Sequence, residues 1–209
     1  MVKISEDTKL TVLNEHYNHT VADIKKLGKS REWSFVIILA LLAVMAFQYV
    51  SPTQSTSVLT EIIQKQLAID ATISINVIGS LVWFALLYVT IRYFQTVINI
   101  EKQYNYIHEL ETQLSRNYDG KAFTREGKAY LNNYAVFSEW VHIVYWYIFP
   151  ALLLIAVSAK IVGEWSAMGV IRMPIILDII IYIAVVISTL LYVYSLHRTP
   201  KNTEKDIKK

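Results

Sequence analysis

The stretch from Ala71 to Leu114 constrains this chain most, because it contains no proline and Gly79 is its only glycine. Its first half, 73–92, is apolar and long enough to cross a bilayer as a helix, which takes roughly 20 residues. From Tyr93 onward, apolar or aromatic residues recur at steps of four and three, with polar residues between them. This pattern is typical of a solvated helix with one apolar stripe. The stretch therefore predicts one helix that leaves the membrane and continues into the cytosol.

The composition places the whole chain among integral membrane proteins. Of its 209 residues 54% are hydrophobic and only 18% are charged, which departs from the balance of a soluble domain. The absence of cysteine excludes disulfides, thiol nucleophiles and thiolate metal sites. The polar first 32 residues do not resemble a cleavable signal peptide. We expect an all-α fold with four transmembrane helices and a cytosolic helical bundle, formed by the N-terminal helix and a hairpin between spans two and three.

Local sequence signals divide the chain further. Gly28 predicts a break before the first span, residues 51–57 predict a loop, and Pro150 predicts a kink in the third span. The predicted segments are a cytosolic helix (1–32), a first span (33–50), an outer loop with a short amphipathic helix (51–70), a second span (71–92), a cytosolic hairpin (93–139), a third span (140–161), an outer loop (162–172), a fourth span (173–196) and a cytosolic tail (197–209).

The distribution of lysine and arginine predicts the orientation. Six lie before the first span, five in the central hairpin and five in the tail, whereas the opposite loops hold only Lys65, Lys160 and Arg172. The positive-inside rule then places both termini and the hairpin in the cytosol. We expect a multi-pass protein of the cell inner (plasma) membrane.

Two apolar stripes are predicted to pack against each other, or against a partner or second copy. Because each stripe is narrow, packing the two helices against each other is the simplest way to bury both stripes. Their members are Leu10, Leu13, Tyr17 and Ile24 in the N-terminal helix, and Val97, Ile100, Tyr104, Ile107 and Leu114 in the hairpin.

Asp178 is the most informative single residue, because an acid inside a span costs about 2.5 kcal/mol or more unless it has a partner or reaches water. It either snorkels or pairs with Lys160 or Arg172, or else it lines a polar seam or pore. Candidates for that seam are Asp178, Tyr182, Thr189, Asn76 and Ser80, although small and polar residues also mark ordinary helix contacts. A second group of polar residues, Arg92, Glu139 and His142, is predicted at the inner membrane interface, where such residues often anchor helix ends.

No catalytic motif is recognisable, so we expect no enzyme and no cofactor. The pairs His16 with His19 and His108 with Glu111 lack a third strong ligand nearby, so we expect no metal site. The lysines of the cytosolic parts are dispersed, which argues against direct binding of nucleic acid.

The stretches Leu13–Thr20, Lys29–Trp33 and Phe123–Leu131 resemble segments of poorly characterised bacterial four-span membrane proteins. In overall plan the chain is also similar to the small membrane subunits of bacterial antiphage systems, among them that of Kiwa. The resemblance implies a bacterial inner-membrane protein that forms oligomers and works with a cytosolic protein partner, and it assigns no functional residue.

We therefore expect an oligomeric membrane protein of a defence or stress system, acting as a membrane sensor or membrane-perturbing effector under control of its cytosolic helices. One alternative is a scaffold that recruits a soluble effector without conduction. A weaker alternative is a small transporter or channel, against which the lack of an internal repeat argues.

Overall fold

The computed structural model describes residues 6–67, 75–115, 140, 143–168 and 173–198. Apart from Ser51 these residues are all helical, which confirms the predicted all-α fold class. Four helices are long and apolar enough to cross a membrane: Asp7–Val50, Val77–Ser115, Val144–Ser166 and Ile175–Leu196. The chain is a multi-pass membrane protein. The predicted return arm of the hairpin, up to residue 139, lies outside the described residues.

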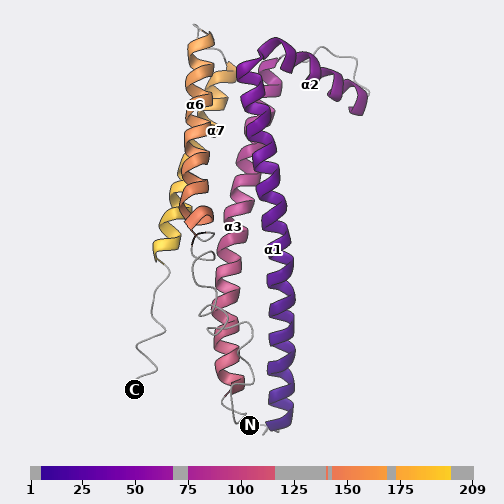
Figure 1. Ribbon diagram of the computed structural model, residues 1–209, viewed down its shortest axis with the longest axis vertical. Helices are drawn as coiled ribbons and strands as arrows, with labels where there is room; N and C mark the ends of the chain where they lie inside the picture. The colour runs from indigo at the N-terminus through magenta and orange to yellow at the C-terminus, as the bar shows by residue number, and fades with distance from the viewer. Residues whose placement is uncertain (1–5, 68–74, 116–139, 141–142, 169–172, 199–209) are drawn as a thin grey trace. The chain divides into compact units, whose positions relative to one another are not determined.

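The first helix, α1 (Glu6–Val50), is unbroken (Figure 1). The predicted break at Gly28 is wrong. One glycine inside a helix costs only about 1 kcal/mol relative to alanine, which the helical turns on both sides outweigh. The N-terminal helix and the first span are therefore a single element.

The predicted loop over 51–57 is also wrong, because α2 (Pro52–Leu67) begins directly after Ser51. Proline suits the first position of a helix, where its missing N–H costs nothing. The hydroxyls of Ser55 and Thr56 donate to the Pro52 carbonyl oxygen at 2.9 and 2.6 Å. Because each hydroxyl is satisfied within the helix, the Ser/Thr run does not require a loop.

The remaining elements are α3 (Ile75–Ser115), a π-helical turn η1 (Val144–Ile148), α6 (Phe149–Met168) and α7 (Met173–Arg198). The π-helical turn ends two residues before Pro150, within the turn whose backbone the proline ring and its missing N–H perturb. The predicted outer loop 162–172 is wrong in its first part, since α6 continues to Met168. α6 and α7 pack side by side (Figure 1).

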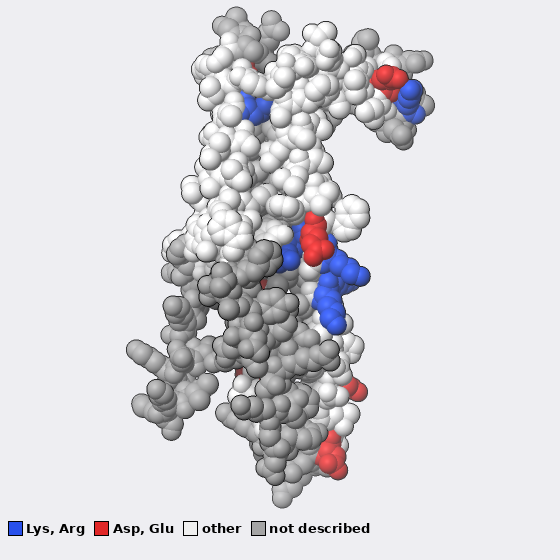
Figure 2. Space-filling model, in the orientation of Figure 1, with Lys and Arg blue, Asp and Glu red and all other residues white. Residues whose placement is uncertain are grey.

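The chain divides into two compact units. Unit 1 comprises Met1–Trp33 and Gln95–Tyr145, and unit 2 comprises Ser34–Phe94 and Trp146–Lys209. α1 and α3 each supply residues to both units. Most of the surface of unit 2 seen in Figure 2 is uncharged. Charged side chains are visible at the end of α2, where Glu61 and Lys65 pair at 2.7 Å, and at one smaller blue patch away from α2.

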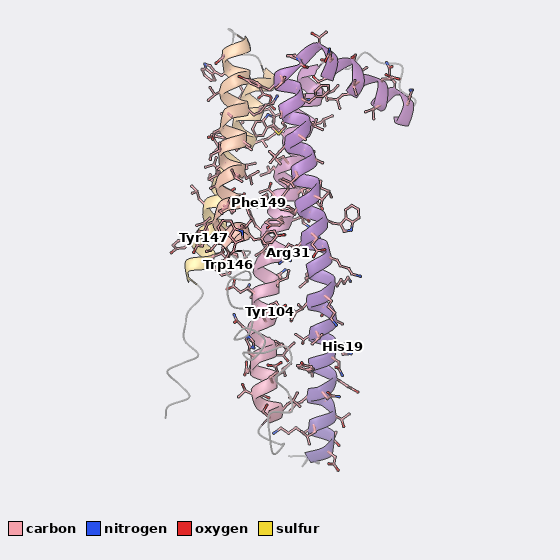
Figure 3. The ribbon with its side chains drawn as sticks, in the orientation of Figure 1. His19, Arg31, Tyr104, Trp146, Tyr147 and Phe149 are labelled. Atoms are coloured by element: carbon pink, nitrogen blue, oxygen red, sulfur yellow. The ribbon has the colours of Figure 1, made fainter. Side chains whose placement is uncertain are left out.

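Aromatic rings join the helices of unit 2. Phe149 of α6, labelled in Figure 3, packs against Phe35 of α1 and Tyr93 of α3, with centroid distances of 4.9 and 5.1 Å. Phe94 of α3 stacks on Tyr192 of α7 at 4.1 Å. Such pairs add roughly 0.5–1.5 kcal/mol each beyond their buried area, so they hold the four spans in register.

Candidate functional site

The packed face of α7 carries the polar residues that were candidates for a seam. Asp178, Thr189 and Tyr192 are buried and Tyr182 is half-buried. The buried positions recur at steps of three and four from Ile175 to Leu196, as expected for one face of a helix. This face points into the bundle rather than toward lipid.

Asp178 is only 4% exposed, and its Oδ1 has no hydrogen-bond partner. Ser80 of α3, 7% exposed, lies close enough for its hydroxyl to act on this carboxyl group. No hydrogen bond of 3.5 Å or less joins them, and Ser80 Oγ is itself without such a bond. The two oxygens are therefore buried together and unsatisfied.

A half-buried ion pair on α6 accompanies Asp178. Lys160 Nζ lies 3.1 Å from Glu164 Oε1, one helical turn away. The indole Nε1–H of Trp83 on α3 donates to the other oxygen of Glu164, with 3.2 Å between nitrogen and oxygen. Lys160 and Glu164 are both close enough to Asp178 to act on its charge. Three spans thus contribute to one group of polar side chains.

Tyr182 completes this arrangement. Its hydroxyl lies 3.0 Å from Ser158 Oγ of α6, and its ring meets Trp83 edge-on with a centroid distance of 6.4 Å. We call the following set the polar cluster: Ser80, Trp83, Ser158, Lys160, Glu164, Asp178 and Tyr182.

Three members of the polar cluster, Ser80, Asp178 and Tyr182, were predicted from the sequence as a polar seam, and the others were not. Lys160 was considered a partner for Asp178, but the structure pairs it with Glu164, a residue assigned to a loop. The spacing of Lys160 and Glu164, four residues apart, was the signal that could have placed both on one helix. Arg172, the other considered partner, lies outside the described residues.

Other predicted site residues are not brought into the polar cluster. Thr189 donates to the carbonyl oxygen of Val185 at 2.8 Å and so is satisfied within its own helix. The side chain of Asn76 lies outside the description. Arg92 is exposed on α3, whereas Glu139 and His142 fall outside the described residues, so the proposed inner-interface group is not assembled here.

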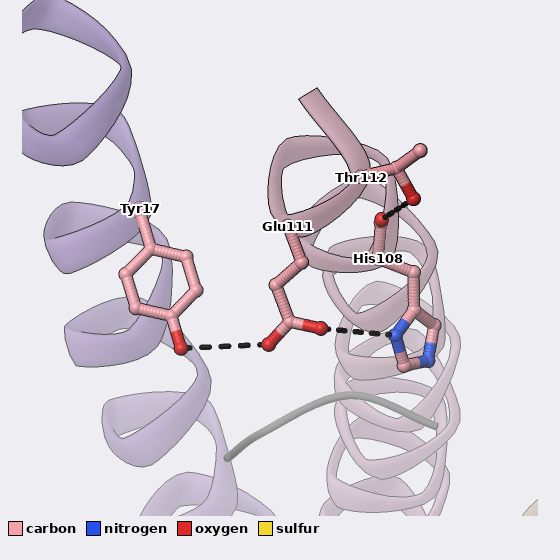
Figure 4. Close-up of polar contacts among 4 residues, drawn as sticks. All are labelled: Tyr17, His108, Glu111 and Thr112. Atoms are coloured by element: carbon pink, nitrogen blue, oxygen red, sulfur yellow. Dashed lines mark hydrogen bonds and ion pairs between the residues drawn. The ribbon is translucent and has the colours of Figure 1, made fainter. Parts of the chain in front are cut away.

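Unit 1 holds a smaller polar contact between the two predicted stripes (Figure 4). The Tyr17 hydroxyl on α1 donates to Glu111 Oε1 on α3 over a long 3.5 Å. The second oxygen of Glu111 lies 3.9 Å from His108 Nδ1. Glu111 is buried, so the contact joins α1 to α3 in a part of unit 1 that is shielded from water.

The stripes themselves differ in burial. On α3, Val97, Ile100, Ile107 and Leu114 are buried, but Tyr104 is 41% exposed. A tyrosine can keep its hydroxyl end in water while its ring covers apolar surface. On α1 the four members Leu10, Leu13, Tyr17 and Ile24 are half-buried.

Further along α1, Arg31 lies over the Tyr145 ring, 5.2 Å from its centroid (Arg31 is labelled in Figure 3). His16 and His19 are exposed. Across the described residues no three His, Asp or Glu side chains gather as metal ligands.

Comparison with protein families, curated proteins and solved structures finds no match for this chain. The polar cluster offers one lysine, two carboxyl groups and three hydroxyls in a buried place, which suits the binding or movement of a proton or charge.

Proposed function

We propose that this chain is a membrane sensor or membrane-perturbing effector, controlled through its unit 1 helices. The observation that supports this is that α1 and α3 each run without a break and contribute residues to both units. A packed helix transmits a displacement along its axis because its hydrogen-bonded turns are stiff. A change at the Tyr17–Glu111 contact would therefore reach the spans through the backbone of two helices.

The cellular setting is part of the same proposal. The lysine and arginine distribution supports an inner-membrane protein with both termini in the cytosol. The apolar or aromatic side chains of Val12, Tyr104 and Tyr106 are exposed on unit 1, which supports a second copy or a cytosolic protein as partner. A role in antiphage defence or stress rests on the resemblance in plan. We propose no enzymatic activity.

The test exploits the absence of cysteine. Tyr17→Cys and Glu111→Cys are introduced together and bridged with a bifunctional thiol reagent, and hydrogen exchange of the spans is measured in lipid nanodiscs. We expect the bridge to change exchange in α6 and α7. As a control, Glu61→Cys with Lys65→Cys is bridged within α2, where no change in α6 or α7 is expected. Identical exchange in α6 and α7 with and without the Tyr17–Glu111 bridge would contradict the proposal.

A channel or transporter is the second candidate, and the polar cluster is the observation that favours it. Flux of ions or protons into liposomes, reduced several-fold by Asp178→Asn, would support conduction. A stoichiometric soluble partner recovered from native membranes without depolarisation would instead favour the scaffold.

A further inference from the structure

We propose that Asp178 is a proton-binding site inside the span bundle, and that release of its proton rearranges the contacts among α3, α6 and α7. The inference does not depend on the sensor proposal. It rests on three observations about the polar cluster.

The first observation is that Asp178 is buried with an oxygen that lacks a partner. The residue is 4% exposed, and Oδ1 makes no hydrogen bond. An ionised carboxylate is an acceptor with about four lone-pair sites, and leaving it unsatisfied away from water is strongly unfavourable. A proton on this carboxyl group removes the charge and turns one oxygen into a donor.

The second observation is that Lys160, the described cation that acts on Asp178, is already engaged. Lys160 Nζ is held 3.1 Å from Glu164, whose other oxygen accepts from Trp83. The charges of Lys160 and Glu164 cancel, so an ionised Asp178 would carry the net charge of the cluster. Within the described residues, Asp178 has no ion pair of its own.

The third observation concerns the ligand that fits. The groups that act on Asp178 are Ser80 of α3, which does not titrate near neutral pH, and Lys160 and Glu164 of α6. On α7 itself, Tyr182 follows Asp178 by one helical turn. Hard metal cations take about six oxygen ligands, whereas the fully buried oxygens of the cluster without a hydrogen bond are only Asp178 Oδ1 and Ser80 Oγ. A proton needs only one oxygen, and the protonated carboxyl group can donate to Ser80.

Release of the proton from Asp178 needs no reactant other than water. The carboxyl O–H bond breaks, its electron pair stays on Asp178 and the proton passes to water. Lys160 then faces two carboxylates and is shared between them, which loosens its bond to Glu164. Because Glu164 is also the acceptor for Trp83, the change reaches α3.

Infrared difference spectroscopy of the protein in lipid membranes tests this directly. A step between alkaline and acidic pH should produce the carbonyl stretch of a protonated carboxyl group in a non-aqueous setting. We expect this band to disappear in Asp178→Asn and to remain in the exposed control Glu61→Gln. Carbon-13 labelling of aspartate carboxyl groups should shift the band in the unaltered chain, which assigns it even if a variant fails to fold.

Three results would overturn the proposal. The band could be missing from the unaltered chain, it could persist in Asp178→Asn, or aspartate labelling could leave it in place. A bound metal ion is tested separately: stabilisation by sodium or magnesium chloride over choline chloride, at constant pH and lost in Asp178→Asn, would also contradict proton binding. Equal melting in all three salts is expected.

Discussion

Trp83 of α3 donates its indole N–H to Glu164 of α6, across 3.2 Å, inside the packed spans. Lys160 holds the other oxygen of the same carboxylate at 3.1 Å. Both carboxylate oxygens of Glu164 therefore have a partner. One partner lies on α3 and the other lies one helical turn away on α6. Asp178, its neighbour in the polar cluster, lacks this support.

Replacing Trp83 by phenylalanine should destabilise the spans. The variant loses an interhelical hydrogen bond worth roughly 0.6–2 kcal/mol in a membrane protein, and it leaves part of the indole volume unfilled. We expect a loss of about 1–3 kcal/mol in the free energy of unfolding, seen as a lower melting temperature in detergent. Trp165→Phe is the matched control, because Trp165 is 56% exposed. Equal melting of the two variants would show that the Trp83–Glu164 bond contributes nothing.

Gly163 allows α1 to approach α6 closely, because a Cβ there would overlap the ring of Tyr49. Gly79 has open space at the same position. Alanine normally stabilises a helix by about 1 kcal/mol relative to glycine, so Gly79→Ala should gain that amount. Gly163→Ala should gain about 1 kcal/mol less unfolding free energy than Gly79→Ala, because the Tyr49 ring, 61% exposed, must rotate away from the added methyl group.

Tyr49→Ala provides the control for this comparison. In that background, Gly163→Ala should show the same gain in unfolding free energy as Gly79→Ala. If the deficit remained after removal of the ring, the close approach would not be its cause.

Long sequence patterns predicted the fold of this chain better than single residues predicted the ends of its helices. Long apolar runs predicted the four spans, because a bilayer requires a fixed length of apolar helix. Gly28 and the stretch 51–57 gave wrong boundaries, because glycine, proline and serine often interrupt helices, whereas the helices of this chain accommodate them. A single residue type does not show how strongly the hydrogen-bonded helical turns on either side of it favour a continuous helix.

The polar cluster was only partly predictable. Asp178, Ser80 and Tyr182 stood out because polar residues are conspicuous inside apolar runs. Trp83 and Glu164 did not, because a tryptophan in a span and an acid near its end have ordinary roles at the interface. Their pairing depends on which spans are neighbours, and no pattern in the sequence specifies that.

Gly28→Ala should stabilise the protein by about 0.5–1 kcal/mol, because Gly28 lies inside α1 with nothing within 4 Å of an added Cβ. Thermal unfolding followed by circular dichroism measures this gain. Destabilisation would indicate that the glycine forms a bend that alanine cannot adopt, in conflict with an unbroken helix.

Glu101 of unit 1 should make stability depend on pH. Burial raises the pKa of this carboxyl group above its ordinary value of 4.5. The folded state therefore binds the proton more tightly than the unfolded state, and this contribution to stability is lost as pH rises from about 4.5 through the raised pKa. Glu101→Gln should melt at a higher temperature than the unaltered chain at pH 8, with no such gain at pH 4. A pH-independent difference would contradict this account.

The continuity of α1 from unit 1 into the spans is the central claim, and a spin-label scan measures it most directly. Single cysteines placed in turn from Lys25 to Ile38, in a chain that has none of its own, report accessibility to water-soluble and lipid-soluble relaxation agents. The account predicts an uninterrupted period of about 3.6 residues, with water contact before Trp33 giving way to lipid contact after it. Loss of the period at Gly28 would contradict it.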